Sequence, residues 1–179
     1  MKIRIHLVLI IFISASLLAL FSTQNTSAEE LSDEQLSRIR SNCLTIQGSL
    51  AQLHASDALL RVNRGQLYES IGTKLMNNFN NRLSNNGLDN KGLVTAADKY
   101  RVGQTNFIES YRLYEQQLTD TIKIDCSKEP AKFHEALLLA RTSRGLVREN
   151  VVKLNLYIDD YRSAVSDFML NFERVTGSN

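Results

Sequence analysis

The sequence has few of the residues that interrupt helices or build disulfide-rich scaffolds. Its 179 residues include one proline, eight glycines, two cysteines and no tryptophan. This composition excludes collagen, low-complexity disorder and a small disulfide-dense domain. A single proline also argues against a loop-rich β-sandwich, because proline is common in the turns of such folds. The composition favours long, uninterrupted helices.

The N-terminal segment has the three parts of a secretory signal peptide. Lys2 and Arg4 precede an apolar run at residues 7–21, and small residues lead to a cleavage site expected after Ala28. The alternative is an uncleaved membrane anchor formed by residues 7–21, although its fifteen residues would span only about 22 Å as a helix. We therefore expect an exported protein that is periplasmic, at the cell surface or secreted. Residues 1–28 are assigned to the signal peptide.

The remainder of the chain has no excess of either charge. Lys2 and Arg4 are two of the 21 basic residues, so residues 29–179 contain 19 basic and 19 acidic residues. This balance removes the electrostatic footprint that nucleic-acid binding needs. The expected partner is a protein, and membrane contact is expected only through an uncleaved N-terminal segment.

Residues 29–179 are predicted to form a single helical-bundle domain with helices at about 32–86, 90–124 and 128–174. Apolar residues recur in each segment at steps of three and four, a period that strands cannot hold. Ser32 and Gln35 form a capping-box pattern at the first start, and Gly87 follows an asparagine pair suited to a helix stop. Pro130 fits the first turn of the third helix.

Short turns between long helices predict an all-α fold: an elongated antiparallel three-helix bundle with coiled-coil-like heptad seams. About 40 residues per helix give a rod of roughly 60 Å. Gly65 and Gly72 weaken the first helix by about 1 kcal/mol each against alanine, so a bend is expected there.

The two cysteines fall at the same level of the predicted hairpin. With a turn near residues 85–87, residues at one level have numbers that sum to about 170–174, and the numbers of Cys43 and Cys126 sum to 169. Export to an oxidising compartment favours their pairing. We predict a Cys43–Cys126 disulfide; the alternative is two unrelated buried thiols.

Four polar residues interrupt the apolar seams: Asp57, Arg64, Gln104 and Arg144. Across the first turn, the same sum places Arg64 near Gln104. Combining the two turns places each residue of the third helix about 85 positions after its neighbour on the first, so Asp57 lies within one helical turn of Arg144. We predict two internal polar layers that fix helix register, because an unpaired buried charge is costly. In the alternative, both arginines extend to solvent past a thin bundle.

No motif for catalysis or cofactor binding is complete. His134-Glu135 opens like a zinc-protease helix, but the second histidine is replaced by Leu138. The sequence has no Cys-x-x-Cys pair and no Glu-x-x-His pair. We expect no enzyme, metal site or cofactor.

Arginines recur along one side of two predicted helices, at Arg61 and Arg64 in the first and at Arg141, Arg144 and Arg148 in the third. They could form a site for an anion or a partner; the alternatives are solvated charge and structural pairing. The aromatic residues of the second helix are interpreted as core.

The segment Leu31-Ser32-Asp33-Glu34-Gln35 resembles the Leu-Thr-x-x-Gln element of small helical periplasmic chaperones of the Spy and CpxP type, with serine in place of threonine. The resemblance implies a chaperone or client-binding protein as one hypothesis. The other, suggested by the exported rod itself, is a structural or protein-interaction module of the cell envelope or surface.

Overall fold

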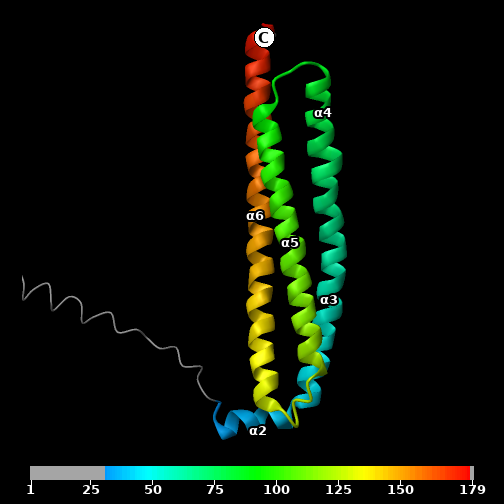
Figure 1. Ribbon diagram of the computed structural model, residues 1–179, viewed down its shortest axis with the longest axis vertical. Coiled ribbons are helices and arrows are strands. Elements are labelled where there is room, and N and C mark those ends of the chain that lie inside the picture. The colour runs from blue at the N-terminus through cyan, green and yellow to red at the C-terminus, as the bar shows by residue number, and fades with distance from the viewer. Residues whose placement is uncertain (1–30, 178–179) are drawn as a thin grey trace, which may run out of the picture. The chain divides into compact units, whose positions relative to one another are not determined.

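The computed structural model describes residues 31–177, and every regular element in this part of the chain is helical (Figure 1). The elements are α2 (Asp33–Ser41), α3 (Cys43–Ser70), the π-helix η2 (Ile71–Asn77), α4 (Asn78–Asn85), α5 (Lys91–Lys123) and α6 (Pro130–Thr176). The predicted all-α class is confirmed for these residues. The predicted signal peptide, residues 1–28, lies outside the described residues.

Three long helical arms run side by side in alternating directions (Figure 1). The first arm is continuous from α3 through η2 to α4, the second is α5 and the third is α6. α5 packs far more extensively against α6 than against α3. The α5–α6 pair therefore forms the main interface, and α3 packs more loosely on it.

The predicted single helix over 32–86 is wrong near its start, because the helix is interrupted at Asn42. The side chains of Ser41 and Asn42 both donate to the carbonyl oxygen of Arg38, at 3.1 and 2.9 Å. Such local bonds compete with the helical backbone pattern. α2 is thereby separated from α3 and makes its contacts with α6.

The predicted turns are confirmed to within two residues. Gly87 adopts a left-handed φ of 69°, which glycine reaches without steric cost. The amides of Gly87 and Leu88 donate to the carbonyls of Ser84 and Leu83, so α4 ends in a Schellman motif. Pro130 is the first residue of α6, where its missing N–H costs nothing.

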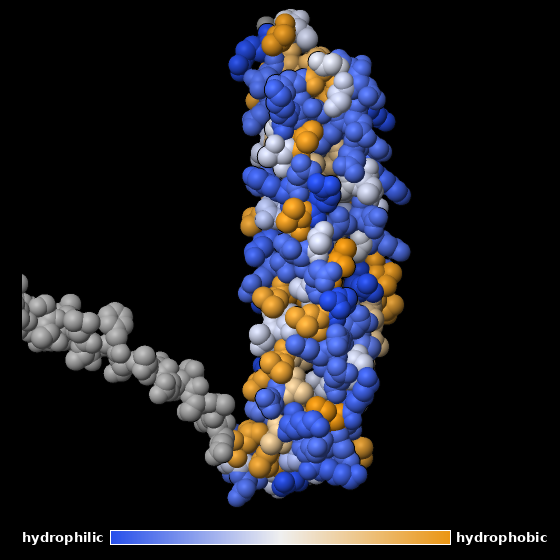
Figure 2. All heavy atoms as spheres, in the orientation of Figure 1, coloured by the Kyte–Doolittle hydropathy of each residue, from blue (hydrophilic) through white to orange (hydrophobic). Residues whose placement is uncertain are grey.

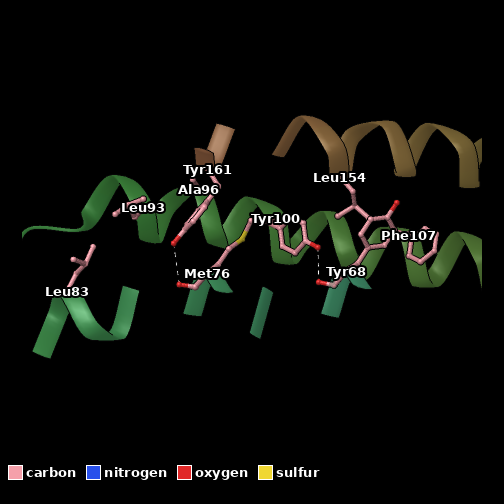
Figure 3. Packing of buried hydrophobic residues seen from close by; sticks show 9 residues of the cluster. All are labelled: Tyr68, Met76, Leu83, Leu93, Ala96, Tyr100, Phe107, Leu154 and Tyr161. Atoms are coloured by element: carbon pink, nitrogen blue, oxygen red, sulfur yellow. Dashed lines mark hydrogen bonds between the residues drawn. The ribbon is translucent and has the colours of Figure 1, made fainter. Parts of the chain in front are cut away.

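About half of the seam positions that steps of three and four predict on α5 and α6 are buried. The buried members on these two helices are Leu93, Tyr100, Phe107, Tyr111, Tyr114, Leu118, Phe133, Ala140, Leu154 and Tyr161. Figure 3 shows Leu154 beside Phe107 and Tyr68, where the three arms meet. The largest cluster of buried apolar side chains lies in this upper part of the arms.

Beyond Asp57 in the first arm, steps of three and four predict a seam through Leu60, Arg64, Leu67, Ile71, Leu75 and Phe79. Ile71 and Phe79 do pack against the core, but the prediction is wrong at the leucines and at Arg64. Leu67 and Leu75 are 56% and 62% exposed, whereas Tyr68 and Met76 are 3% and 2% exposed. Tyr68 lies eleven residues after Asp57, which is about three turns of an α-helix, so both side chains point to the same face. The predicted steps of three and four instead reach Leu67 after ten residues. The wide turn of η2 then keeps Met76 on the same face.

Tyrosine hydroxyls from the other two arms bind carbonyls at this irregular region. Tyr100 donates to the carbonyl of Tyr68 at 2.7 Å, and the hydroxyl of Tyr161 lies 3.3 Å from the carbonyl of Met76 (Figure 3). The same hydroxyl donates to Oδ1 of Asn80 at 2.8 Å. A π-helix changes the intrahelical hydrogen-bond pattern, so external donors at its ends help to satisfy its carbonyls. Gly72, one of the two positions where the sequence predicts a bend, lies within this π-helix.

Substitution Gly103→Ala is expected to lower the free energy of unfolding by about 1 kcal/mol, because the methyl group overpacks the α5–α6 interface. A Cβ at this position would lie 2.7 Å from two ring carbons of Tyr157 and 3.4 Å from Leu154. Chemical denaturation measures the change.

Gly48→Ala is the matched control, since nothing lies within 4 Å of its added Cβ. It should stabilise the protein by up to about 1 kcal/mol through helix propensity. Equal stabilisation by both substitutions would contradict the close packing at Gly103.

Candidate functional site

The lower end of the first and second arms is joined covalently. The structure pairs Cys43 with Cys126 in a disulfide whose Cα atoms lie 5.4 Å apart, which is the pairing that the level argument predicts. Nε2 of Gln47 donates to the carbonyls of Ile122 and Ile124 at 3.1 and 2.9 Å, which secures the end of α5 to α3. Both cysteines pack with Phe133 in a small apolar cluster.

A polar layer lies near the middle of α3, about one third of the way along the first arm. Arg144 donates from Nε and Nη2 to the two carboxylate oxygens of Asp57, at 3.1 and 3.3 Å. Tyr114 donates its hydroxyl to Oδ2 of Asp57 at 2.6 Å. The predicted Asp57–Arg144 pair is thus brought together, with a tyrosine from α5 as its third member. The same level argument also places Tyr114 beside Asp57, so the signal for it was present in the sequence.

The environment of this layer differs between its two sides. The Asp57 side chain is 11% exposed, whereas that of Arg144 is 53% exposed. The hydrogen bond to Asp57 raises the pKa of Arg144. Burial, with a contribution from the same carboxylate, raises the pKa of Tyr114. The layer therefore holds one guanidinium in a fixed position at the surface between α3 and α6.

The predicted contact between Arg64 and Gln104 is wrong. Their level is right, but they face different directions. Arg64 is exposed and lies on the side of α3 that faces α6, whereas Oε1 of Gln104 lies 3.7 Å from the Cβ position of Gly72. Arg64 leaves the buried face of α3 because that face passes from Asp57 to Tyr68.

A groove of about 560 Å³ lies between α3 and α6, with α5 as its floor, and we name it the arginine groove. Its walls carry five arginines, its floor is mainly aromatic and Asp57 is its one acidic residue. It is lined by Asp57, Leu60, Arg61, Arg64, Phe107, Tyr111, Tyr114, Arg141, Arg144, Gly145, Val147, Arg148 and Val151. The five arginines that the sequence placed on two separate helices thus converge on one groove.

Four of these arginines have no carboxylate partner within residues 31–177: Arg61, Arg64, Arg141 and Arg148. Elsewhere on the described surface, seven basic residues pair with an acid three or four positions earlier, and seven others have no such pair: Arg40, Lys74, Arg82, Lys91, Lys99, Lys153 and Arg174. The pairs are formed by Arg38, Arg101, Arg112, Lys123, Lys128, Lys132 and Arg162. The groove differs from the remaining surface in that four arginines without a carboxylate partner line the same hollow.

The local sequence explains why these arginines have no carboxylate partner on their own helix. No acidic residue lies three or four positions from Arg64, Arg141, Arg144 or Arg148. Arg61 has Asp57 four positions earlier, but Arg144 and Tyr114 occupy that carboxylate. The guanidinium carbon of Arg61 instead lies 5.3 Å from the ring centre of Tyr111, a cation–π geometry.

Metal ligands, histidines and apolar helices are the other features that would indicate a functional site. Residues 31–177 contain no cluster of three or more histidine, cysteine or acidic side chains placed to hold a metal ion. His54 lies 3.3 Å from the hydroxyl of Thr119. In the same part of the chain, no helix combines the length and apolarity that a membrane crossing needs.

Comparison with known protein families, with curated proteins and with solved structures gives no match. The arginine groove is therefore interpreted from its own geometry and charge.

The Asp57–Arg144 pair is expected to contribute about 1 kcal/mol to stability, because one partner is buried and the geometry is bidentate. A double-mutant cycle with Asp57→Asn and Arg144→Gln measures this coupling by chemical denaturation.

The control is the same cycle on the exposed pair Asp159 and Arg162, with side chains 64% and 78% exposed. Its coupling should be about 0.3 kcal/mol. A coupling between Asp57 and Arg144 no larger than that of the control pair would show that Arg144 is only surface charge.

Proposed function

We propose that this chain is an exported structural or protein-interaction module of the cell envelope or surface, and that it binds another protein through the arginine groove. The observation that carries the proposal is the convergence of five arginines, four without a carboxylate partner, on one groove between α3 and α6. Arginine is the side chain best suited to paired hydrogen bonds with carboxylates at protein interfaces.

The arrangement of charge supports binding rather than stability. Arg141, Arg144 and Arg148 are spaced by three and four residues, and like charges at this spacing destabilise a helix. One of the three is neutralised by Asp57. The remaining repulsion would be relieved by a partner that brings acidic groups.

Site-specific photo-crosslinking tests the proposal in the native cells of the protein. A photoreactive residue at Leu60, which lines the groove, should yield a discrete protein adduct. The same residue at the exposed Leu113, outside the groove, should not. The Leu60 adduct should be lost in the variant Arg61→Gln/Arg64→Gln. Adducts at both positions, or an adduct that persists in the variant, would contradict a groove-borne interaction.

We also propose that residues 1–28 direct export and are removed. The disulfide is consistent with an extracytoplasmic compartment. Mass spectrometry of the exported protein should find an N-terminus near Glu29. An intact Met1 terminus in the membrane fraction would support the alternative anchor at residues 7–21.

The finer architecture is part of the same proposal: an elongated antiparallel three-helix bundle with heptad-like seams in solution. The extensive α5–α6 interface and the apolar seams of these helices support it. Small-angle scattering should give the profile of a rod of roughly 60 Å, as expected for helices of about 40 residues.

A chaperone or client-binding protein is the second candidate. Exposed leucines on the first arm favour it, with Leu59, Leu67 and Leu75 between 56% and 68% exposed. Figure 2 shows the apolar residues of one face as small groups separated by hydrophilic residues. This hypothesis expects the purified protein to suppress aggregation of an unfolded client, and an inert protein in that assay would eliminate it.

A further inference from the structure

We infer that the arginine groove binds an amphipathic helix of a partner protein, with glutamate or aspartate residues at one-turn intervals. This inference rests on the proposed function and names the chemistry of the partner. It is carried by the register of the two walls, by the charge they present and by the apolar character of the surface between them.

The walls run in the same direction with an offset of 85–87 residues. Asp57 and Arg144 are 87 residues apart, and the Met76–Tyr161 contact higher on the same arms spans 85 residues. An offset of 87 places Arg148 on α6 directly across from Arg61 on α3. Two guanidinium groups without carboxylate partners thus face each other over the groove.

An anionic group between these walls would bind to both of them. Arg61 is held on the Tyr111 ring and Arg144 is held by Asp57, so two of the five guanidinium groups are already oriented. Such preorganisation lowers the entropic cost of binding. Each guanidinium has five donors, and Arg144 uses only two of them on Asp57.

The spacing of the arginines matches the spacing of side chains on a helix. Arg141, Arg144 and Arg148 recur at one-turn intervals along α6, and Arg61 and Arg64 do so along α3. Acidic residues three or four positions apart on a bound helix have the same interval of about 5–6 Å. A carboxylate row on each flank of that helix would meet one wall.

The surface between the arginine rows favours a helix over a phosphate-bearing polyanion. Leu60 is 50% exposed there, and Val147 and Val151 are half-buried beside it. A phosphate chain would pair the arginines but leave this apolar surface in water. The apolar stripe of an amphipathic helix would cover it, as helix-in-groove complexes do.

Gly145 leaves space for such an occupant. It lines the groove, and a Cβ added to it would meet nothing within 4 Å. Packing within the chain therefore does not require glycine here, although glycine in a helix costs about 1 kcal/mol relative to alanine. A close approach by a partner backbone is a use for this position.

A binding experiment on the full exported chain tests the inference. The probe is a helix-constrained, fluorescent peptide of about four turns, with a leucine stripe flanked by glutamates at one-turn spacing. Its control replaces every glutamate with glutamine. Fluorescence anisotropy should show binding of the glutamate peptide that weakens with added salt, and no binding of the glutamine peptide.

Two double variants of equal charge locate the site. Arg61→Gln/Arg148→Gln should weaken the peptide about tenfold or more. Arg101→Gln/Arg162→Gln, which removes two arginines that pair with Asp98 and Asp159, should leave the affinity unchanged within about twofold. Removal of the facing arginines should not lower the melting temperature, which separates loss of binding from loss of fold.

Competition with inorganic triphosphate separates this inference from the proposed function. Tighter binding of triphosphate than of the peptide, or equal effects of the two double variants, would overturn the helical partner. A groove-specific crosslink at Leu60 that triphosphate abolishes and the peptide does not would retain the protein-binding function and reject the helix. If the protein with its five arginines intact gave no adduct at Leu60 in the absence of competitor, the proposed function would be rejected.

Discussion

Reduction of the Cys43–Cys126 disulfide is expected to lower the free energy of unfolding by about 4 kcal/mol while leaving the helices formed at room temperature. The two cysteines are 83 residues apart, and a loop of this length loses much conformational entropy in the unfolded chain when it is closed. The apolar contacts of α5 with α6 do not depend on the bond, so helix content should persist.

Denaturant titrations of the oxidised and reduced protein, followed by circular dichroism, measure this effect. The variant Cys43→Ala/Cys126→Ala should match the reduced protein. Free thiols on both cysteines in correctly exported protein would show that the pair does not form. A complete loss of helix on reduction would show that the arms are held together by the bond alone.

The free energy of unfolding is expected to fall steeply in alkaline solution, because buried tyrosines lose their protons more readily in the unfolded chain. Burial raises the pKa values of Tyr100, Tyr111, Tyr114 and Tyr161, the last to about 12. The unfolded chain loses these protons near pH 10. The stabilisation is therefore complete below about pH 10 and is lost as the pH rises towards the pKa values of the folded state.

A tyrosine contributes at most about 1.4 kcal/mol per pH unit between its unfolded and folded pKa values, so the buried tyrosines together should remove on the order of a few kcal/mol by about pH 11. Denaturant titrations at pH 8 and at increasing pH measure the loss. Tyrosinate absorbance should rise together with the loss of helix. Tyr161→Phe should reduce the slope. Tyrosines that titrate near pH 10 in a fully helical protein would contradict their burial.

Helix positions and turns could be predicted from the sequence because their signals are local. The sequence near Gly87 and Pro130 specifies how a helix ends or begins, and the structure places both turns within two residues of the expected points. The level of Asp57 against Arg144 follows from these turns. Which residues of two antiparallel helices lie at the same level depends only on the position of the turn between them.

The direction in which a side chain faces was harder to predict. Arg64 was assigned to a buried seam because a heptad was extended past Asp57, and the π-helix η2 that follows could not be derived from apolar spacing. The break at Asn42 was missed for a similar reason: its cause is a competition for one carbonyl of Arg38. A small change in helical winding rotates a seam without shifting its level.

To predict the arginine groove, both the level of each arginine along its helix and the direction in which it faces would have to be known. The five arginines could be assigned to two helices from their spacing, but their convergence depends on α3 and α6 lying on either side of α5. It also depends on Arg64 leaving the seam, so the wrong prediction for this residue concealed part of the site.

The position of the disulfide determines how the chain would respond to mechanical tension. A force applied to the two ends of residues 31–177 would pass from α2 through Cys43 directly to Cys126 and on into α6. The residues between the cysteines, which include all of α5, would bear no load while the bond is intact. Only α2 and α6 would be stretched, and reduction of the bond would release the intervening chain as additional length of about 3.5 Å per residue. The oxidised protein would resist extension, whereas the reduced one would lengthen under the same force.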